Sequence, residues 1–176
     1  MKHCDKIVDV GRRAFFARSA VVAAGAAAST AIPIGTAKAA PSLARVTYPS
    51  TRIANIRDLK IDEPRAVAYP DADSPGVLVK LGRPVEGGVG AEGDIVAFST
   101  ICPHKGFPLF YRAEDKTLNC PGHYSRFDVE KGGLEIWGHA TQNRAQFRLR
   151  IDQAGDIHAE GVDELIYGRL SNVLRA

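Results

Sequence analysis

Cysteine is scarce in this chain, with three among 176 residues. Cys4 lies in an N-terminal segment with the features of an export signal, so a processed protein would keep only Cys102 and Cys120. Two cysteines in an exported domain could form one disulfide. Each of them, however, has a histidine two or three residues further along the chain. This pairing favours metal binding over a disulfide.

An excess of charge of one sign is also lacking once the N-terminal segment is set aside. The whole chain has a formal net charge of +3. Residues 1–39 hold six basic and two acidic side chains, so the remaining 137 residues hold 17 basic and 18 acidic ones. The basic character of the precursor is therefore no evidence for a nucleic-acid partner, and we expect none. A stretch of 137 residues fits one domain with a modest core.

Residues 1–39 have the features of a twin-arginine export signal. The run GRRAFF at 11–16 precedes an uncharged, alanine-rich stretch at 19–37, and AKA at 37–39 forms the expected cleavage site. The stretch is nearly long enough to span a bilayer, but it has no leucine and is interrupted by Pro33 and Gly35. We therefore expect cleavage after Ala39 and a periplasmic protein. Retention of the segment as a membrane anchor stays open.

Two short runs carry the residues that are most informative about function. ICPHKGF contains Cys102 and His104, and NCPGHYS contains Cys120 and His123, with fifteen residues between His104 and Cys120. Each run offers one thiolate and one imidazole. A 2Fe-2S centre of the Rieske type has two cysteines on one iron and two histidines on the other. The pattern predicts one such cluster, with these four residues as its metal ligands.

A structural zinc site is the alternative, because two Cys and two His also make a tetrahedral zinc shell. Zinc fingers usually bring two Cys from one turn and two His from one helix. Here each run is mixed, and Cys102 and His104 are separated by a single residue. Such close spacing suits two metal ions better than one.

No convincing amphipathic helix and no internal repeat occur in residues 40–176, whereas short runs typical of β-strands are frequent. They cover residues 77–81, 95–98, 134–137 and 147–151, and a turn at 152–156 leads into a partner strand at 157–160. A polar lead through residues 53–56 precedes them. The pattern predicts an all-β domain over residues 40–176, an antiparallel sandwich or small barrel. The metal-binding loops would form a subdomain within residues 100–128.

Both motif runs resemble those of Rieske proteins. DIVAFSTICPHKGFP, NCPGHYSRFD and the C-terminal VDELIYGRLSNVL together resemble the small subunit of arsenite oxidase over nearly the whole processed chain. The resemblance implies a fold of Rieske type and an oxidoreductase subunit that carries electrons without a substrate-converting site of its own. It also implies partners, namely a large molybdopterin-containing subunit that oxidises arsenite and a c-type cytochrome or azurin that accepts the electrons.

Carried over by position, the resemblance implies that Cys102 and Cys120 bind the inner iron and that His104 and His123 bind the outer, solvent-near iron. Ser125 matches a serine whose hydroxyl donates a hydrogen bond to a cluster sulfur, which makes it a further cofactor-binding residue.

Three other positions qualify the resemblance. Phe127 replaces a tyrosine that donates a second hydrogen bond to the cluster in respiratory Rieske proteins. Many Rieske proteins also have two further cysteines, joined in a disulfide between the loops, where this chain has Phe107 and Gly122. We expect the Phe107 ring to cover Gly122 in place of that bond.

The first alternative function is the Rieske subunit of a related molybdoenzyme such as iodate reductase, with electrons flowing in the opposite direction, since substrate choice lies in the large subunit. A zinc-binding interaction module without redox activity is the alternative of a different class. His139 and His158 have no partner at metal-ligand spacing and are predicted to face solvent. Trp137 is predicted to be a core or edge aromatic.

Overall fold

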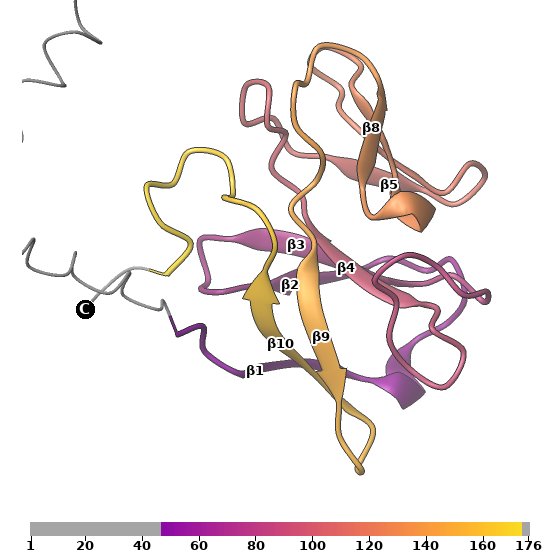
Figure 1. The fold of residues 1–176 in the computed structure, drawn as a ribbon. Helices are drawn as coiled ribbons and strands as arrows, with labels where there is room; N and C mark the ends of the chain where they lie inside the picture. Colours follow the sequence, from indigo (N-terminus) through magenta and orange to yellow (C-terminus); the bar gives the residue numbers. More distant parts are fainter. Residues whose placement is uncertain (1–46, 174–176) are drawn as a thin grey trace, which may run out of the picture. The chain divides into compact units, whose positions relative to one another are not determined.

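The computed structural model describes residues 47–173, which form ten short strands in three antiparallel sheets (Figure 1). The first sheet has the strand order β1-β10-β9, the second β2-β3-β4, and the third β5-β6-β7-β8. The strands are β1 (Thr51–Asn55), β2 (Arg65–Ala68), β3 (Pro75–Lys80), β4 (Ile95–Ser99), β5 (Phe110–Arg112), β6 (Thr117–Asn119), β7 (Arg126–Asp128), β8 (Leu134–Trp137), β9 (Phe147–Ile151) and β10 (Asp156–Val162). Two single-turn 3-10 helices lie at Ile56–Asp58 and Val129–Lys131. The predicted all-β class is confirmed.

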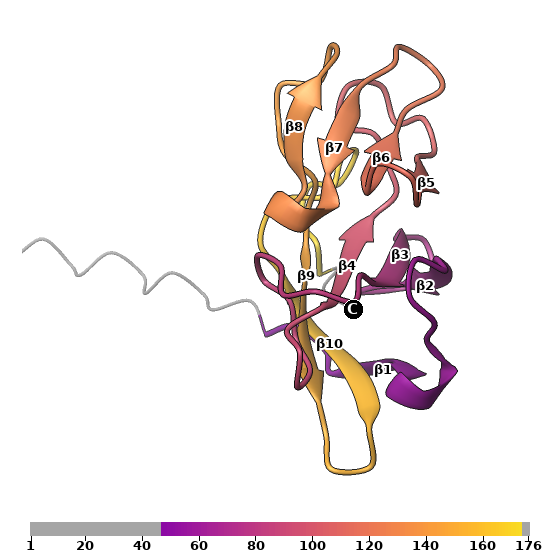
Figure 2. The same ribbon diagram turned by 90° about the vertical axis from the view of Figure 1, so that its right-hand side faces the viewer.

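The third sheet forms a separate layer. In both views, β5 to β8 lie at one end of the molecule and the other six strands at the opposite end (Figures 1 and 2). The chain passes into the third sheet after β4 and returns to the other two sheets at β9. A β-bridge between Phe98 in β4 and Gln146, next to β9, holds these two connecting segments side by side. The β5–β8 sheet is therefore an insertion into a base made of the other two sheets. Both motif loops belong to this part of the chain, which continues through β8 beyond residue 128, the predicted limit of the subdomain.

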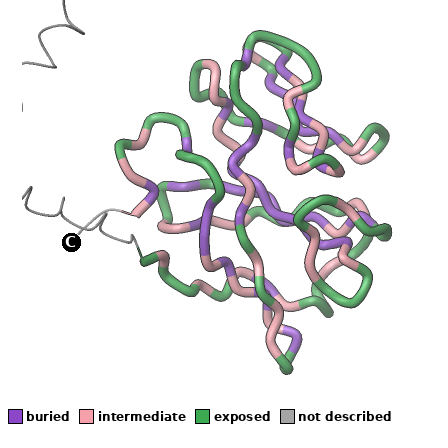
Figure 3. The backbone as a smooth tube through the Cα atoms, viewed as in Figure 1, coloured by how far each residue is buried: buried purple, intermediate pink, exposed green. Residues whose placement is uncertain are grey.

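Strands β3 and β4 are buried on both faces, which explains their continuous apolar sequences. Val77 and Phe98 are paired in register and belong to the core that also contains Cys102 and Cys120. Leu78 and Ala97, the next pair along the two strands, belong to a second core that includes residues of β9 and β10. Figure 3 shows the buried residues concentrated along these strands and the exposed ones in the connecting loops. The sheet β2-β3-β4 thus connects the base core to the motif loops.

The predicted strands at 77–81, 95–98, 134–137, 147–151 and 157–160 correspond to β3, β4, β8, β9 and β10 within a few residues. Residues 53–56 were expected to be a polar lead, and this is wrong. They belong to strand β1 and its following turn, and β1 pairs with β10. Strands β5, β6 and β7 have three residues each. A run of three residues is too short to show an alternating pattern.

The predicted export signal at 1–39 lies outside the described residues, so the domain boundary after residue 39 stays a prediction. Within residues 47–173 no helix has the length and apolar character needed to cross a membrane.

Candidate metal centre

The first motif loop follows β4 and is folded back by two hydrogen bonds at Cys102. The backbone N–H of Cys102 donates to the carbonyl of Phe107, and the N–H of Gly106 donates to the carbonyl of Cys102, both at 2.8 Å. Gly106 has a φ of 72°, in the left-handed region where a residue without Cβ is favoured. The glycine of this loop therefore permits the tight turn around the cysteine.

A second motif loop, between β6 and β7, repeats this hydrogen-bond pattern. The N–H of Cys120 donates to the carbonyl of Ser125 at 2.9 Å, and the N–H of Tyr124 donates to the carbonyl of Cys120 at 3.1 Å. Tyr124 takes the place of Gly106 and has a φ of 62°, an uncommon conformation for a residue with a side chain. The two loops are therefore two copies of one turn, each with a cysteine at its base and a histidine near its tip.

The two cysteines are free and almost fully buried, with exposed fractions of 0% for Cys102 and 2% for Cys120. Burial raises the pKa of the Cys102 thiol, the backbone N–H groups of His104 and Lys105 lower it, and the adjacent Cys120 raises it again. Backbone N–H groups directed at a sulfur stabilise its anionic form. Two adjacent buried thiols, with such donors at Cys102, form a site for a positively charged metal, which would favour the thiolate.

The two histidines form a second pair nearer the surface. The ring centroids of His104 and His123 lie 4.7 Å apart at an interplanar angle of 76°. Nδ1 of His104 is buried without a hydrogen-bond partner in the described residues. Loss of hydration lowers the pKa of His104, and the neighbouring His123 and His139 lower it further. A neutral imidazole with an unused ring nitrogen is the form that binds a metal.

Ser125, the fifth predicted cofactor-binding residue, is fully buried immediately before β7. Its Oγ accepts hydrogen bonds from the backbone N–H groups of His139 and Ala140, each at 3.0 Å. A hydroxyl has two acceptor lone pairs and one hydrogen. Both lone pairs are used, and the hydrogen stays free to donate. This arrangement fits the role that the resemblance implies, and that role stays a prediction.

His139 is close to the motif histidines, which the sequence did not reveal. Its exposed ring stacks on His104 at a centroid distance of 5.7 Å and an angle of 27°, and lies 6.4 Å from His123. The segment after β8 brings it there, because Gly138 packs against Ser125 so closely that a Cβ would lie 2.4 Å from Ser125 Cα. His139 faces solvent as expected, but it is a neighbour of the site. His158 lies in β10, where Nε2 is 3.1 Å from Asp152 Oδ2.

The surface around the histidine pair is aromatic. His123, Tyr124, Trp137, Gly138 and His139 line a pocket of about 370 Å³. Tyr124 is 74% exposed, and Trp137, at the end of the edge strand β8, is 69% exposed. Of the two predicted positions, core or edge, Trp137 therefore occupies the edge.

The cysteine pair lies in the core and the histidine pair near the surface, so the four side chains form two groups. Within the part of the chain that the structure describes, no set of three or more His, Cys, Asp or Glu side chains surrounds a single point suitable for one ion. A tetrahedral zinc shell requires four ligands around one ion. Two thiols in one group and two imidazoles in the other fit the two differently ligated irons of a mixed cluster.

The family model for the Rieske [2Fe-2S] domain matches residues 50–148, which include both motif loops. This chain is a Rieske [2Fe-2S] domain protein. Proteins of this family bind one 2Fe-2S cluster, and the four motif side chains together with the unused Nδ1 of His104 fit that group.

Two relatives of this Rieske protein resemble it over most of its length. It is 41% identical to iodate reductase subunit IdrB of Denitromonas iodatirespirans over 174 residues, which is 97% of this chain and 94% of the relative. It is 42% identical to the subunit of the same name from Pseudomonas sp. (strain SCT) over 127 residues, covering 70% of this chain and 66% of the relative.

Among solved structures, the soluble domain of Rieske protein II (soxF) from Sulfolobus acidocaldarius aligns with a TM-score of 0.63 and 25% identity. The alignment covers 70% of this Rieske chain and 82% of the other. The predicted Rieske fold is thereby confirmed.

Proposed function

We propose that this chain is the electron-transfer Rieske subunit of a periplasmic molybdoenzyme of the iodate reductase type. The observation that carries the proposal is the 41% identity to an iodate reductase subunit along 97% of the chain. The motifs and the C-terminal run predict arsenite oxidase, with iodate reductase as the alternative, whereas the two similar relatives, which match 97% and 70% of this chain, are iodate reductase subunits. Electrons would then pass from a reduced periplasmic carrier, such as a c-type cytochrome or azurin, through this chain to the large molybdopterin subunit.

In this proposal, Cys102 and Cys120 would hold one iron, and His104 and His123 would hold the other. The bound cluster supplies reversible transfer of a single electron. The protein excludes water from the thiol side by burying both cysteines. It leaves His123 exposed on the side that a redox partner can approach.

Affinity purification of the chain from its native periplasm, followed by identification of the co-purifying subunit, tests the proposal. We expect a molybdopterin subunit in the complex and iodate-dependent oxidation of a reduced c-type cytochrome. Arsenite-dependent reduction of the cytochrome by the same complex, with no activity toward iodate, would instead support the arsenite oxidase assignment. A His104→Ala complex should assemble and lose electron transfer, whereas the distant His158→Ala should keep it. Iodate reduction by the His104→Ala complex at the normal rate would refute the role as electron conduit.

The class of the metal is tested on the isolated chain. We expect two irons and two sulfides per chain and a rhombic electron paramagnetic resonance signal after reduction. One zinc per chain and no signal would support the interaction module.

Export through the twin-arginine route is part of the proposal, because a protein that acquires its cluster in the cytoplasm would have to cross the membrane folded. The features of residues 11–39 support it.

A further inference from the structure

Arg144 is a buried cation without a counter-ion among the described residues. It lies between β8 and β9, and the residue is only 2% exposed. Nε and Nη1 are both buried without a hydrogen-bond partner within residues 47–173. A charge without a hydrogen-bonded partner in a protein interior is strongly destabilising.

The backbone holds Arg144 in place by a close contact with the turn before β8. The N–H of Arg144 donates to the carbonyl of Gly133 at 2.8 Å. A Cβ on Gly133 would lie 2.7 Å from Arg144 Cβ and 2.9 Å from Phe98 Cε1, and the φ of Gly133 is 75°. Only glycine allows both this conformation and this approach. Arg144 is therefore fixed against the core that contains Phe98.

The guanidinium faces the ring of Phe127, with Cζ 5.3 Å from the ring centroid. Phe127 belongs to the same buried cluster as Cys102 and Cys120. Burial lowers the pKa of Arg144 to about 10, and Cys102 is the first of the negative groups that oppose this shift, ahead of Glu164. The side chain is thus charged at neutral pH, and its field acts on the thiolate side of the metal centre.

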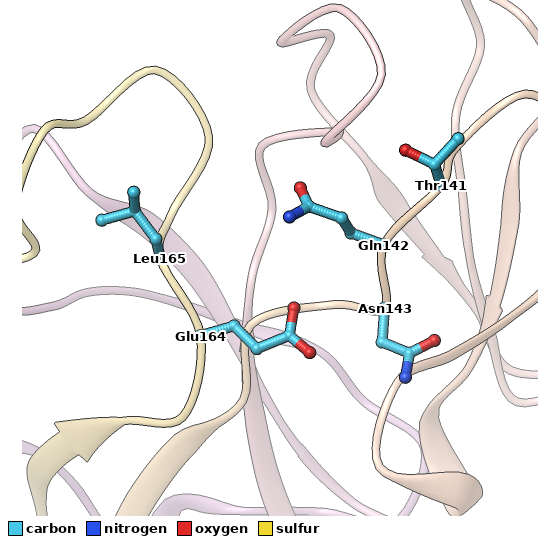
Figure 4. A pocket seen from close by; sticks show the side chains of 5 residues that line it. All are labelled: Thr141, Gln142, Asn143, Glu164 and Leu165. Carbon is cyan, nitrogen blue, oxygen red and sulfur yellow. The ribbon is translucent and has the colours of Figure 1, made fainter. Parts of the chain in front are cut away.

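The segment just before Arg144 lines an open polar pocket. Thr141, Gln142 and Asn143, the three residues before it, line this pocket of about 410 Å³ together with Glu164 and Leu165 (Figure 4). Glu164 extends its carboxylate toward the segment 141–143 (Figure 4). Glu164 and Asp163 act on the Arg144 charge from a distance, and neither forms an ion pair with it.

A cluster of two ferric ions, two sulfides and two thiolates is neutral, and one added electron makes its charge −1. We propose that Arg144 is the buried counter-charge for this electron, a positioning residue that raises the reduction potential of the centre. The redox partner supplies the electron, and no bond is formed or broken. Attraction between unit charges is much stronger in a poorly hydrated core than in water. The proposal rests on the family's cluster and not on the identity of the large subunit.

The test is the reduction potential of the purified full chain with its cluster, measured by protein-film voltammetry. Arg144→Met removes the charge and leaves an apolar side chain of similar reach. We expect the equilibrium constant for reduction to fall at least tenfold, which is 59 mV for a one-electron couple. Arg144→Lys keeps the charge, so the fall in its reduction potential should be at most half of the fall in Arg144→Met. The rhombic resonance signal should persist in both variants.

Arg148→Met is the matched control, because it removes the same charge from an exposed side chain four residues away. Its potential should equal that of the wild type. If Arg144→Met does not take up the cluster, Arg144→Gln replaces it with the same expected fall. The proposal is overturned if the neutral variant keeps the wild-type potential, if Arg144→Lys falls as far as Arg144→Met, or if both neutral variants fail to assemble, which would assign a structural role. None of these results depends on the iodate reductase assignment.

Discussion

The ring of Phe107 lies directly on the backbone of Gly122 and joins the two motif loops by an apolar contact. A Cβ on Gly122 would lie 2.9 Å from both Cγ and Cδ2 of Phe107. The same ring meets His123 edge to face at 5.8 Å. The expectation that Phe107 covers Gly122 is therefore confirmed, and the contact occupies the place where many Rieske proteins have a disulfide.

Gly122→Ala should lower the stability of the domain, because the added methyl group overlaps the Phe107 ring. Overpacking of this kind costs about 1–3 kcal/mol. The measurement is urea unfolding of the cluster-loaded protein, and Phe107→Ala in the same chain should recover part of the loss. Gly161→Ala is the control, since its Cβ would meet only the flexible Arg148 side chain at 3.3 Å. Equal losses at the two glycines would contradict the close contact.

The double variant Phe107→Cys/Gly122→Cys should form a disulfide between the loops. The Cβ of Gly122 would lie 2.9 Å from Phe107 Cγ, so the two Cβ atoms are at most one bond length further apart, within the usual range for a disulfide. Thiol titration and intact mass should detect the bond under oxidising conditions. Two free thiols in the folded oxidised protein would refute this geometry.

Cys102→Ser should abolish the cluster, because only Cys102 and Cys120 are available as thiolates in residues 40–176. His139→Gln, which alters a histidine stacked on His104 at 5.7 Å but outside the predicted ligand set, should retain the cluster. Iron content and the rhombic signal after reduction distinguish these outcomes. A signal that persists in Cys102→Ser, or that is lost in His139→Gln, would require a different ligand set.

Ser125→Ala should destabilise the centre by about 1–3 kcal/mol, because it leaves the N–H groups of His139 and Ala140 without their acceptor. The potential should fall as well if the free hydroxyl hydrogen donates to the cluster. Unfolding and voltammetry measure the two effects separately. Lower stability with an unchanged potential would restrict Ser125 to supporting the loop of His139.

Asp156, in the β1-β10-β9 sheet, should contribute to the loss of domain stability at acid pH. Hydrogen bonds from Arg52 and Asn55 hold its pKa at about 2, below the ordinary value of 3.8. A carboxyl group whose pKa is lower in the folded state than in the unfolded state stabilises the fold at pH values above the unfolded-state pKa. For Asp156 this contribution is lost as the pH falls from about 3.8 toward 2. The urea midpoint should therefore fall more steeply in this window for the wild type than for Asp156→Asn. Parallel curves would show that the contact between β1 and β10 contributes nothing.

The sequence by itself determined the predicted ligand set and the fold class. Cys102, His104, Cys120 and His123 occur in two runs short enough for each loop to fold locally around its cysteine. The structure pairs the two histidines and places the two cysteines in one core cluster, and their role as ligands stays a prediction. Strands β3, β4 and β9 were predictable because their apolar residues are contiguous or alternate in runs of four or five. These features depend on neighbours in the chain.

Tertiary structure alone decided which residues surround the centre. His139 comes beside His104 because the segment after β8 packs on Ser125, a contact that no spacing in the sequence reveals. Arg144 is buried because its segment lies against Gly133, although a charged residue in a connection between strands is normally expected at the surface. Contacts between distant segments depend on how the sheets stack, and a local pattern carries no information about that stacking.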